Sequence, residues 1–295
     1  MPVSKSRRKK KSSAKAKPPE LDFITLDDLG PLQEFLAELG DSEEEADALV
    51  EAQELVYDAW EARTRKRRID LARKALEISP DCADAYVLLA EEAAKSLDEK
   101  IDIYRRGVEA GERAVGPESF EEDIGHFWGL LETRPYMRAR SGLAVALWLK
   151  GEKEEAVEHF RDLLRLNPND NQGIRYILAA RYLDLGWDDD LSALLKAYKD
   201  DIAAVWTYSR ALLAYRRQGD TKRSRKLLSQ AIASNPHVPD YLLGKSRLPK
   251  KSPEYIGIGD EREAIAYVQD CASGWTKVPA SLDWLNSFIT KEGRV

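Results

Sequence analysis

Apolar residues recur along most of the chain with the spacing of amphipathic helices, and glycines and prolines divide the pattern into paired segments. Residues 141–151 and 154–168 form one pair, and residues 208–219 and 227–236 form another. Each pair has an apolar helix, a Gly turn, a second apolar helix and a closing Asn-Pro. The closing residues, Pro168 and Pro236, lie 68 residues apart. The chain is therefore expected to repeat a two-helix unit.

The spacing of 68 residues is twice the 34-residue period of tetratricopeptide (TPR) helix pairs. A weaker pair lies between the two clear copies, in residues 174–195. Two more precede them, in residues 43–62 with 69–78 and in residues 83–94 with 96–108. About five pairs exceed the roughly three that a stacked array needs. We predict an all-α, TPR-like, right-handed helical-repeat solenoid over residues 20–243.

The first part of this region has its own expected boundaries. Helical spacing runs from Leu21 to Leu39, and Gly40 with Asp41 is expected to end that helix. Ser42 and Glu45 then have the spacing of a capping box, which predicts that a new helix starts there.

An insertion interrupts the regular period. Pro80 and Pro168 are 88 residues apart, 20 more than two periods. The excess predicts an inserted element at about residues 115–133, with a short helix containing Phe120, Ile124, Phe127 and Trp128. Such an insertion could bind a partner or simply cover an apolar edge.

The pattern changes again after Pro236. A Pro-rich loop leads to a helix at about residues 261–275 and to another that contains Trp284 and Phe288. We expect residues 244–295 to form a C-terminal cap on the open end of the array.

Charge is distributed unevenly. The net charge is −6, but residues 1–17 carry eight basic residues and no acid, so residues 18–295 carry a net −14. Residues 1–19 are expected to be a disordered basic tail. The tail could serve solubility alone, or it could attract nucleic acid or a ribosome, an alternative function that would use Lys5, Arg7, Arg8, Lys9, Lys10 and Lys11.

The sequence offers little that indicates catalysis. His126, His159 and His237 lie in separate elements without the spacing of metal ligands, and no nucleophile elbow, Walker motif or dinucleotide fingerprint occurs. The two cysteines, Cys82 and Cys271, suit a reducing compartment. No apolar run approaches the ~20 residues of a membrane span. We expect a cytoplasmic protein that is not an enzyme and needs no metal or cofactor.

The expected activity is protein–protein interaction, as a scaffold or adaptor. In a TPR array the first helix of each pair lines a groove, and TPR spacing predicts six candidates that face it: Arg138, Trp148, Arg175, Tyr182, Trp206 and Arg216. The wider set adds Ser141, Val145, Gln172, Ala179, Ser209 and Leu213. Arginines and aromatics together suit an acidic or carboxylate-ended peptide with apolar anchors. The alternative is that these side chains pack between repeats or pair with neighbouring acidic residues.

The C-terminal segment resembles a known family. The residues that carry the resemblance are Asn-Pro-His-Val-Pro at 235–239, Pro-Glu-Tyr-Ile at 253–256 and Gly-Asp-Glu-Arg-Glu-Ala-Ile-Ala-Tyr at 259–267, followed by Trp275. They are similar to the end of the suppression-of-tumorigenicity-seven family, and the similarity covers about residues 134–285. The resemblance implies TPR-like repeats and a scaffold, with no catalytic residues to transfer. The membrane association of animal members is not expected here.

Overall fold

The computed structural model describes the backbone of residues 30–291 and the side chains of residues 44–291. The chain divides after Ala48, and residues 49–295 make up the larger compact unit. Before that point the described backbone is helical from Gly30 onward. The described elements are α1 (Gly30–Glu61), α2 (Arg65–Ile78), α3 (Ala83–Glu92), α4 (Leu97–Val115), α5 (Ser119–Glu122), η2 (Phe127–Gly129), α6 (Arg134–Lys150), α7 (Lys153–Leu166), α8 (Ile174–Leu185), α9 (Asp188–Ala197), α10 (Ala204–Gln218), α11 (Lys222–Ser234), α12 (Val238–Leu242), α13 (Glu261–Thr276) and α14 (Ser281–Lys291).

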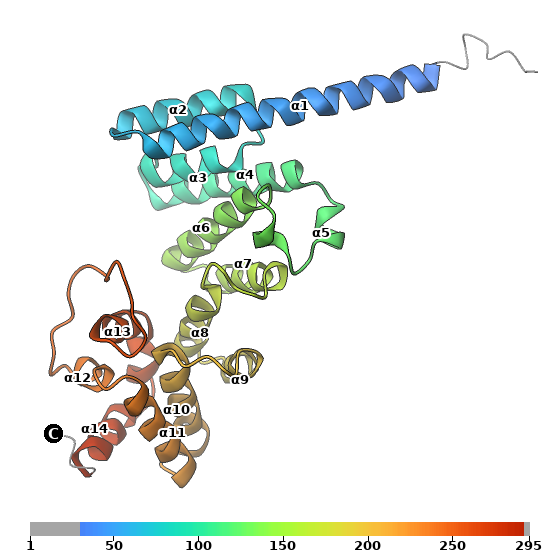
Figure 1. Cartoon of the computed structure of the whole chain (residues 1–295). Coiled ribbons are helices and arrows are strands. Elements are labelled where there is room, and N and C mark those ends of the chain that lie inside the picture. Colours follow the sequence, from blue (N-terminus) through green and yellow to red (C-terminus); the bar gives the residue numbers. More distant parts are fainter. Residues whose placement is uncertain (1–29, 292–295) are drawn as a thin grey trace, which may run out of the picture. The chain divides into compact units, whose positions relative to one another are not determined.

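Five helix pairs follow one another along the chain (Figure 1). They are α1 with α2, α3 with α4, α6 with α7, α8 with α9, and α10 with α11. Close packing joins the members of the four later pairs, and it also joins the first helices α3 and α6 and the first helices α8 and α10. The predicted TPR-like, all-α repeat architecture is confirmed.

Local capping explains where several helices start and stop. Ser96 accepts a hydrogen bond from the amide of Glu99 at 3.1 Å, which begins α4 as its sequence predicts. Thr221 and Ser224 form a reciprocal capping box at the start of α11. Gly151 ends α6 in the left-handed conformation that glycine adopts without strain.

The predicted break at Gly40 is wrong. The backbone of α1 continues from Gly30 to Glu61, so Ser42 and Glu45 lie inside a helix and do not cap one. A single glycine costs a helix about 1 kcal/mol, which neighbouring helical turns can offset. The part of the expected helix before residue 30 lies outside the described residues.

Close approach of backbones holds the middle of the array together. A Cβ at Gly111 of α4 would lie 2.9 Å from the Cα and Cβ of Tyr136 on α6, and one at Gly142 of α6 would overlap the ring of Tyr104. Glycine at both positions lets α4 and α6 pack at shorter range than larger residues allow. This part of the array therefore depends on small residues at named sites.

The insertion contains two short helices, α5 and η2, where a single one was expected. Phe127 is fully buried, and its ring lies 5.1 Å from Phe120 and 6.2 Å from Tyr136. Ile124, in contrast, is 43% exposed. The insertion thus covers the apolar start of α6.

The C-terminal segment packs onto the preceding repeats. Helix α13 contacts α8 and α10, and Figure 1 shows it on the opposite side of α8 from α9. The first helices of the pairs present a surface on the side where α13 packs, and we call it the first-helix face. It is formed by α1 from residue 49, α3, α6, α8 and α10. The expected cap therefore also covers part of the face on which a partner was expected.

Candidate functional site

Arg138, the first of the expected groove residues, is held by residues of its own chain. Its Nε donates to Oδ1 of Asp84 at 2.7 Å, and a second nitrogen pairs with the other oxygen of that carboxylate. Gln53 of α1 donates to the same carboxylate at 3.0 Å. The guanidinium also lies over the ring of Trp60, 5.4 Å from its centroid. Arg138 thus joins three consecutive first helices.

The other two expected arginines are paired in the same way. Arg175 makes ion pairs of 2.9 Å with Asp170 and with Asp201. Arg216 pairs with Asp188 at 3.1 Å and donates to a backbone carbonyl of α8. Their charges are therefore already neutralised within the array.

The three expected aromatic residues are largely inside the protein. Trp206 is fully buried and Tyr182 is 4% exposed. Trp148 is half-buried between two cations, the Nζ of Lys153 at 4.8 Å and the guanidinium of Arg181 at 4.5 Å from its ring centroid. The expectation that these aromatics anchor a partner is wrong for Trp206 and Tyr182, because their side chains are not accessible.

Helix α13 covers the first-helix face over α8 and α10. A Cβ on Gly274 would lie 2.9 Å from the Cβ of Leu183, so the two helices meet without side chains between them. Asp184, at the end of α8, accepts a hydrogen bond of 2.6 Å from Ser273 and also binds Lys277. Lys153 of α7 binds the other oxygen of Asp184 at 2.8 Å.

These donors control the charge state of Asp184. Its burial disfavours the carboxylate, but the hydrogen bonds from Lys153, Lys277 and Ser273 outweigh that effect and hold its pKa well below the ordinary value. Asp184 is thus a charged point at which α7, α8 and α13 meet.

Buried hydrogen bonds also hold the start and the end of α13 in place. Glu263 is 5% exposed and accepts hydrogen bonds from the amide of Ala204, at the start of α10, and from the side chain of Asn235, both at 2.8 Å. Trp275 is fully buried and donates to the hydroxyl of Tyr267 at 2.7 Å. The part of the face formed by α8 and α10 is therefore occupied by the chain itself.

An open cleft remains over α3 and α6, and we call it the α3–α6 cleft. Its volume is about 410 Å³, and its lining includes Val87, Glu91, Lys100, Tyr104, Val145 and Leu149. Val145 is 38% exposed and Leu149 is 69% exposed. The two residues are four apart, so they form a short apolar stripe on α6. Arg138, Ser141 and Gln172 of the expected groove also line this cleft.

Charged and apolar groups meet in the α3–α6 cleft. Desolvation raises the pKa of Glu91 above its ordinary value, and the positive charge of Lys100 opposes the shift. Burial raises the pKa of Tyr104 as well, so its hydroxyl stays neutral and can donate a hydrogen bond. The cleft can therefore bind an apolar side chain beside a polar group.

Sequence reasoning missed Leu149 and Glu91. Leu149 lies next to the polar end of α6, and no TPR groove position falls on it. The signal that could have found it is its spacing of four residues from Val145, which extends an apolar stripe that the core does not use.

The remaining expected residues lie elsewhere. His159 accepts a hydrogen bond from Arg140 at 3.2 Å, and burial lowers its pKa, so the side chain packs within the array in its neutral form. Cys82 and Cys271 are free and buried.

In residues 44–291 no three His, Cys, Asp or Glu side chains gather as a metal ion would require. Nor does any helix in the described chain have the length and apolar character to span a bilayer. The tail residues Lys5, Arg7, Arg8, Lys9, Lys10 and Lys11 lie outside the described residues.

Consecutive helix pairs that pack against one another, as α4 does on α6 and α7 does on α8, define a helical-repeat protein of the TPR type. The model of the ST7 protein family matches residues 42–294, and the chain belongs to that family. The expected resemblance is thus confirmed, and it extends further toward the N-terminus than the sequence motifs indicated.

Curated relatives carry the same family name. The chain is 32% identical to "Protein ST7 homolog" of Drosophila melanogaster, over 82% of this chain and 49% of that protein. It is 31% identical to the human "Suppressor of tumorigenicity 7 protein-like", over 82% of this chain and 46% of that protein. The chain thus spans about half the length of the curated relatives it matches. Among solved structures, the TPR protein YrrB, described as having an unusual peptide-binding site, aligns with a TM-score of 0.44 and 16% identity over 68% of this chain and 91% of that chain.

Proposed function

We propose that this chain is a non-enzymatic adaptor that holds a helical segment of a partner protein in the α3–α6 cleft. The observation that carries the proposal is the exposed stripe of Val145 and Leu149 on the part of the first-helix face that α13 leaves open. When a partner covers exposed apolar groups at a cleft, their removal from water stabilises the complex.

The packing of α13 supports a helix as the bound form. On α8 and α10 the first-helix face already accepts a helix, with a glycine at the closest approach and Trp275 as a buried anchor. The same kind of surface continues over α3 and α6 without an occupant from residues 44–291. A partner helix with an apolar face and a small residue at the crossing point fits this geometry.

An acidic partner is not proposed for this cleft. The arginines that suggested one are neutralised by aspartates of the array, as the pairing of Arg138 with Asp84 illustrates. Binding at the α3–α6 cleft is therefore expected to depend mainly on apolar contact and to change little with salt concentration.

A photo-crosslinking experiment tests the proposal. A photoreactive amino acid is placed at Leu149 of the full chain in its native cell, and in a second strain at Ile202, which is 61% exposed and lies outside the cleft. The crosslinked segment is identified by mass spectrometry and synthesised as a peptide. We expect a partner segment of helical periodicity at Leu149 that is absent at Ile202.

Binding of that peptide is then compared among variants. The double variant Val145→Glu/Leu149→Glu should bind at least about tenfold more weakly, because it places charge where apolar contact is needed, whereas Ile202→Glu should bind as wild type does. Equal crosslinking at both positions, or unchanged binding by the double variant, would contradict the proposal.

A further inference from the structure

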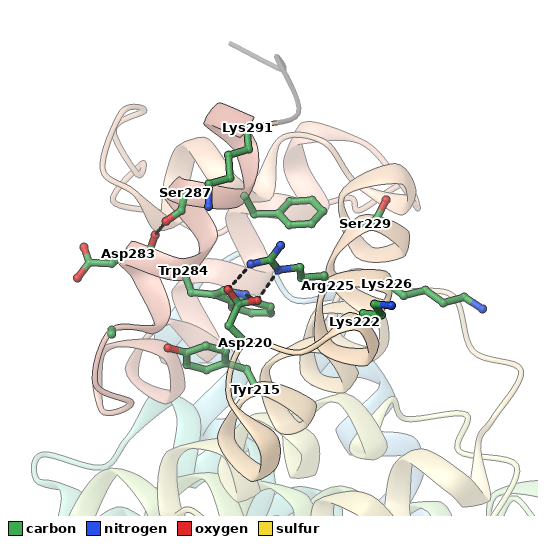
Figure 2. Close-up of a pocket in the computed structure, with 12 residues that line it drawn as sticks. Tyr215, Asp220, Lys222, Arg225, Lys226, Ser229, Asp283, Trp284, Ser287 and Lys291 are labelled. Carbon is green, nitrogen blue, oxygen red and sulfur yellow. Dashed lines mark hydrogen bonds and ion pairs between the residues drawn. The ribbon is translucent and has the colours of Figure 1, made fainter.

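Another cleft lies at the C-terminal end of the described chain, away from the α3–α6 cleft. It has a volume of about 560 Å³ and lies between α11, the end of α10, and α14 (Figure 2). We call it the α11–α14 cleft. One wall is aromatic: Tyr215 stacks on Trp284 with ring centroids 4.4 Å apart, and Phe288 follows one turn further along α14. Trp284 and Phe288 are only 5% and 9% exposed, so the part of this wall that a ligand can reach is mainly the half-buried Tyr215.

Asp220 holds this wall in place. Its carboxylate accepts two hydrogen bonds of 2.6 Å from Arg225 and one of 3.1 Å from the indole of Trp284, as Figure 2 shows. The hydrogen bonds from Arg225 are the main reason that the pKa of Asp220 lies below its ordinary value. The charge of Asp220 is therefore matched within the protein, and it does not repel an anionic ligand as a free carboxylate would.

Apart from Arg225, which pairs with Asp220, the basic side chains of the cleft are lysines. Lys222 and Lys226, one turn apart on α11, line it together with Lys291, and among the described residues no carboxylate lies within 4.0 Å of Lys222 or Lys226. Four basic and two acidic side chains line the cleft, although residues 18–295 carry a net −14. The cleft is thus a positive site on an acidic protein.

A second cleft extends the positive surface to another face of α11. It has a volume of about 380 Å³, and its lining includes Lys196, Lys199, Arg210, Arg217 and Arg223 but no carboxylate of the described residues. Arg217 is paired with Asp189, so its charge is already balanced within the chain. Together the two clefts place positive charge on both sides of the first half of α11.

We propose that the α11–α14 cleft binds an acidic segment of a partner protein. Carboxylates of that segment pair with the exposed Lys222 and Lys226, and one apolar side chain packs beside the half-buried Tyr215. Salt screens the attraction between lysine and carboxylate. Binding at the α11–α14 cleft should therefore weaken as the salt concentration rises, whereas binding at the α3–α6 cleft should change little. A long polyanion fits less well, because the acidic surface beyond the clefts repels it.

The test uses fluorescence anisotropy of the full chain with a dye-labelled pool of octapeptides, each with several Asp or Glu and one Leu, Phe or Trp. A matched pool has Asn for Asp and Gln for Glu. We expect the acidic pool to bind and the amide pool to bind at least about tenfold more weakly. Lys222→Glu/Lys226→Glu should weaken binding of the acidic pool by a similar factor.

The control variant carries the same charge change elsewhere. Lys66→Glu/Lys74→Glu alters two exposed residues of α2 and should leave binding of the acidic pool within about twofold of wild type. Both double variants should keep the thermal unfolding midpoint of wild type. Since Val145→Glu/Leu149→Glu should not affect the acidic pool, failure of either proposed site is distinguishable from failure of the other.

Three results would overturn the proposal. The first is no binding of the acidic pool to wild type, and the second is equal binding by the variant Lys222→Glu/Lys226→Glu. The third is tighter binding of phosphatidylserine vesicles or single-stranded RNA through the same two lysines, which would assign the cleft to a different anion.

Discussion

Arg138 of α6 and Asp84 of α3 form a two-point ion pair in which the carboxylate side chain has no exposure to solvent. The two residues are 54 positions apart. A buried carboxylate that keeps its partner is tolerated, whereas one that loses it is costly. This pair therefore matters more to the integrity of the array than any surface ion pair.

Arg138→Met should destabilise the chain by about 2–3 kcal/mol, since it leaves Asp84 with only Gln53 as a donor. Equilibrium urea unfolding followed by tryptophan fluorescence measures the change. Arg105→Met is the matched control, because Arg105 and Glu155 form an exposed pair worth less than about 1 kcal/mol. Equal effects of the two substitutions would show that the buried pair has no special role.

Gly274→Val should displace α13 from α8, because its Cβ would already lie 2.9 Å from that of Leu183. Hydrogen exchange of the amides in α13 should accelerate by at least about tenfold, while exchange in α3 and α4 stays unchanged. Gly129→Val is the control, since a Cβ at Gly129 has no neighbour within 4 Å. Unchanged protection of α13 in Gly274→Val would contradict the close packing.

The stabilisation from Asp184 should depend on pH. Its folded pKa is lower than the ordinary value of 3.8, so the charged form stabilises the fold at neutral pH. The contribution is complete above the ordinary value and is lost progressively as the pH falls below it toward the folded pKa. Asp184→Asn should therefore be less stable than wild type at about pH 7, and the difference in unfolding free energy should shrink at about pH 3. A difference that is the same at both values would rule out this charge effect.

Both cysteines should resist alkylation in the folded protein. Burial raises the pKa of Cys82 to about 11, and it also raises that of Cys271, which is fully buried in α13. Thiolate, the reactive form, is therefore scarce at neutral pH. In a chain with Cys82→Ala, the rate at which iodoacetamide modifies Cys271 should report the opening of α13 and rise in Gly274→Val. Fast modification of wild-type Cys271 would mean that α13 is not docked.

The helix pairs could be predicted because they depend on local information. The spacing of apolar residues, the turn at Gly151 and the cap at Ser96 all act within a few residues. Gly40 misled the same reasoning, since a glycine lowers helix propensity without deciding whether a helix ends.

The candidate site could not be predicted in the same way. TPR spacing places Arg138 and Arg175 on first helices, but Asp84, which neutralises Arg138, lies 54 residues away, and Asp201, one of the two partners of Arg175, lies 26 residues away. The contact between Gly274 and Leu183 joins the C-terminal segment to a repeat, and nothing in either local pattern indicates it. Which part of the first-helix face stays open is a property of tertiary packing alone.

The docking of α13 changes what the number of repeats means for recognition. In a helical-repeat array the count of helix pairs usually indicates how long a bound segment can be. Here five pairs are present, yet α8 and α10 already hold a helix of the same chain. A count of repeats would therefore overestimate the footprint of a ligand on this face, and shortening the chain after α11 would lengthen that footprint while exposing the apolar surface that Trp275 now fills.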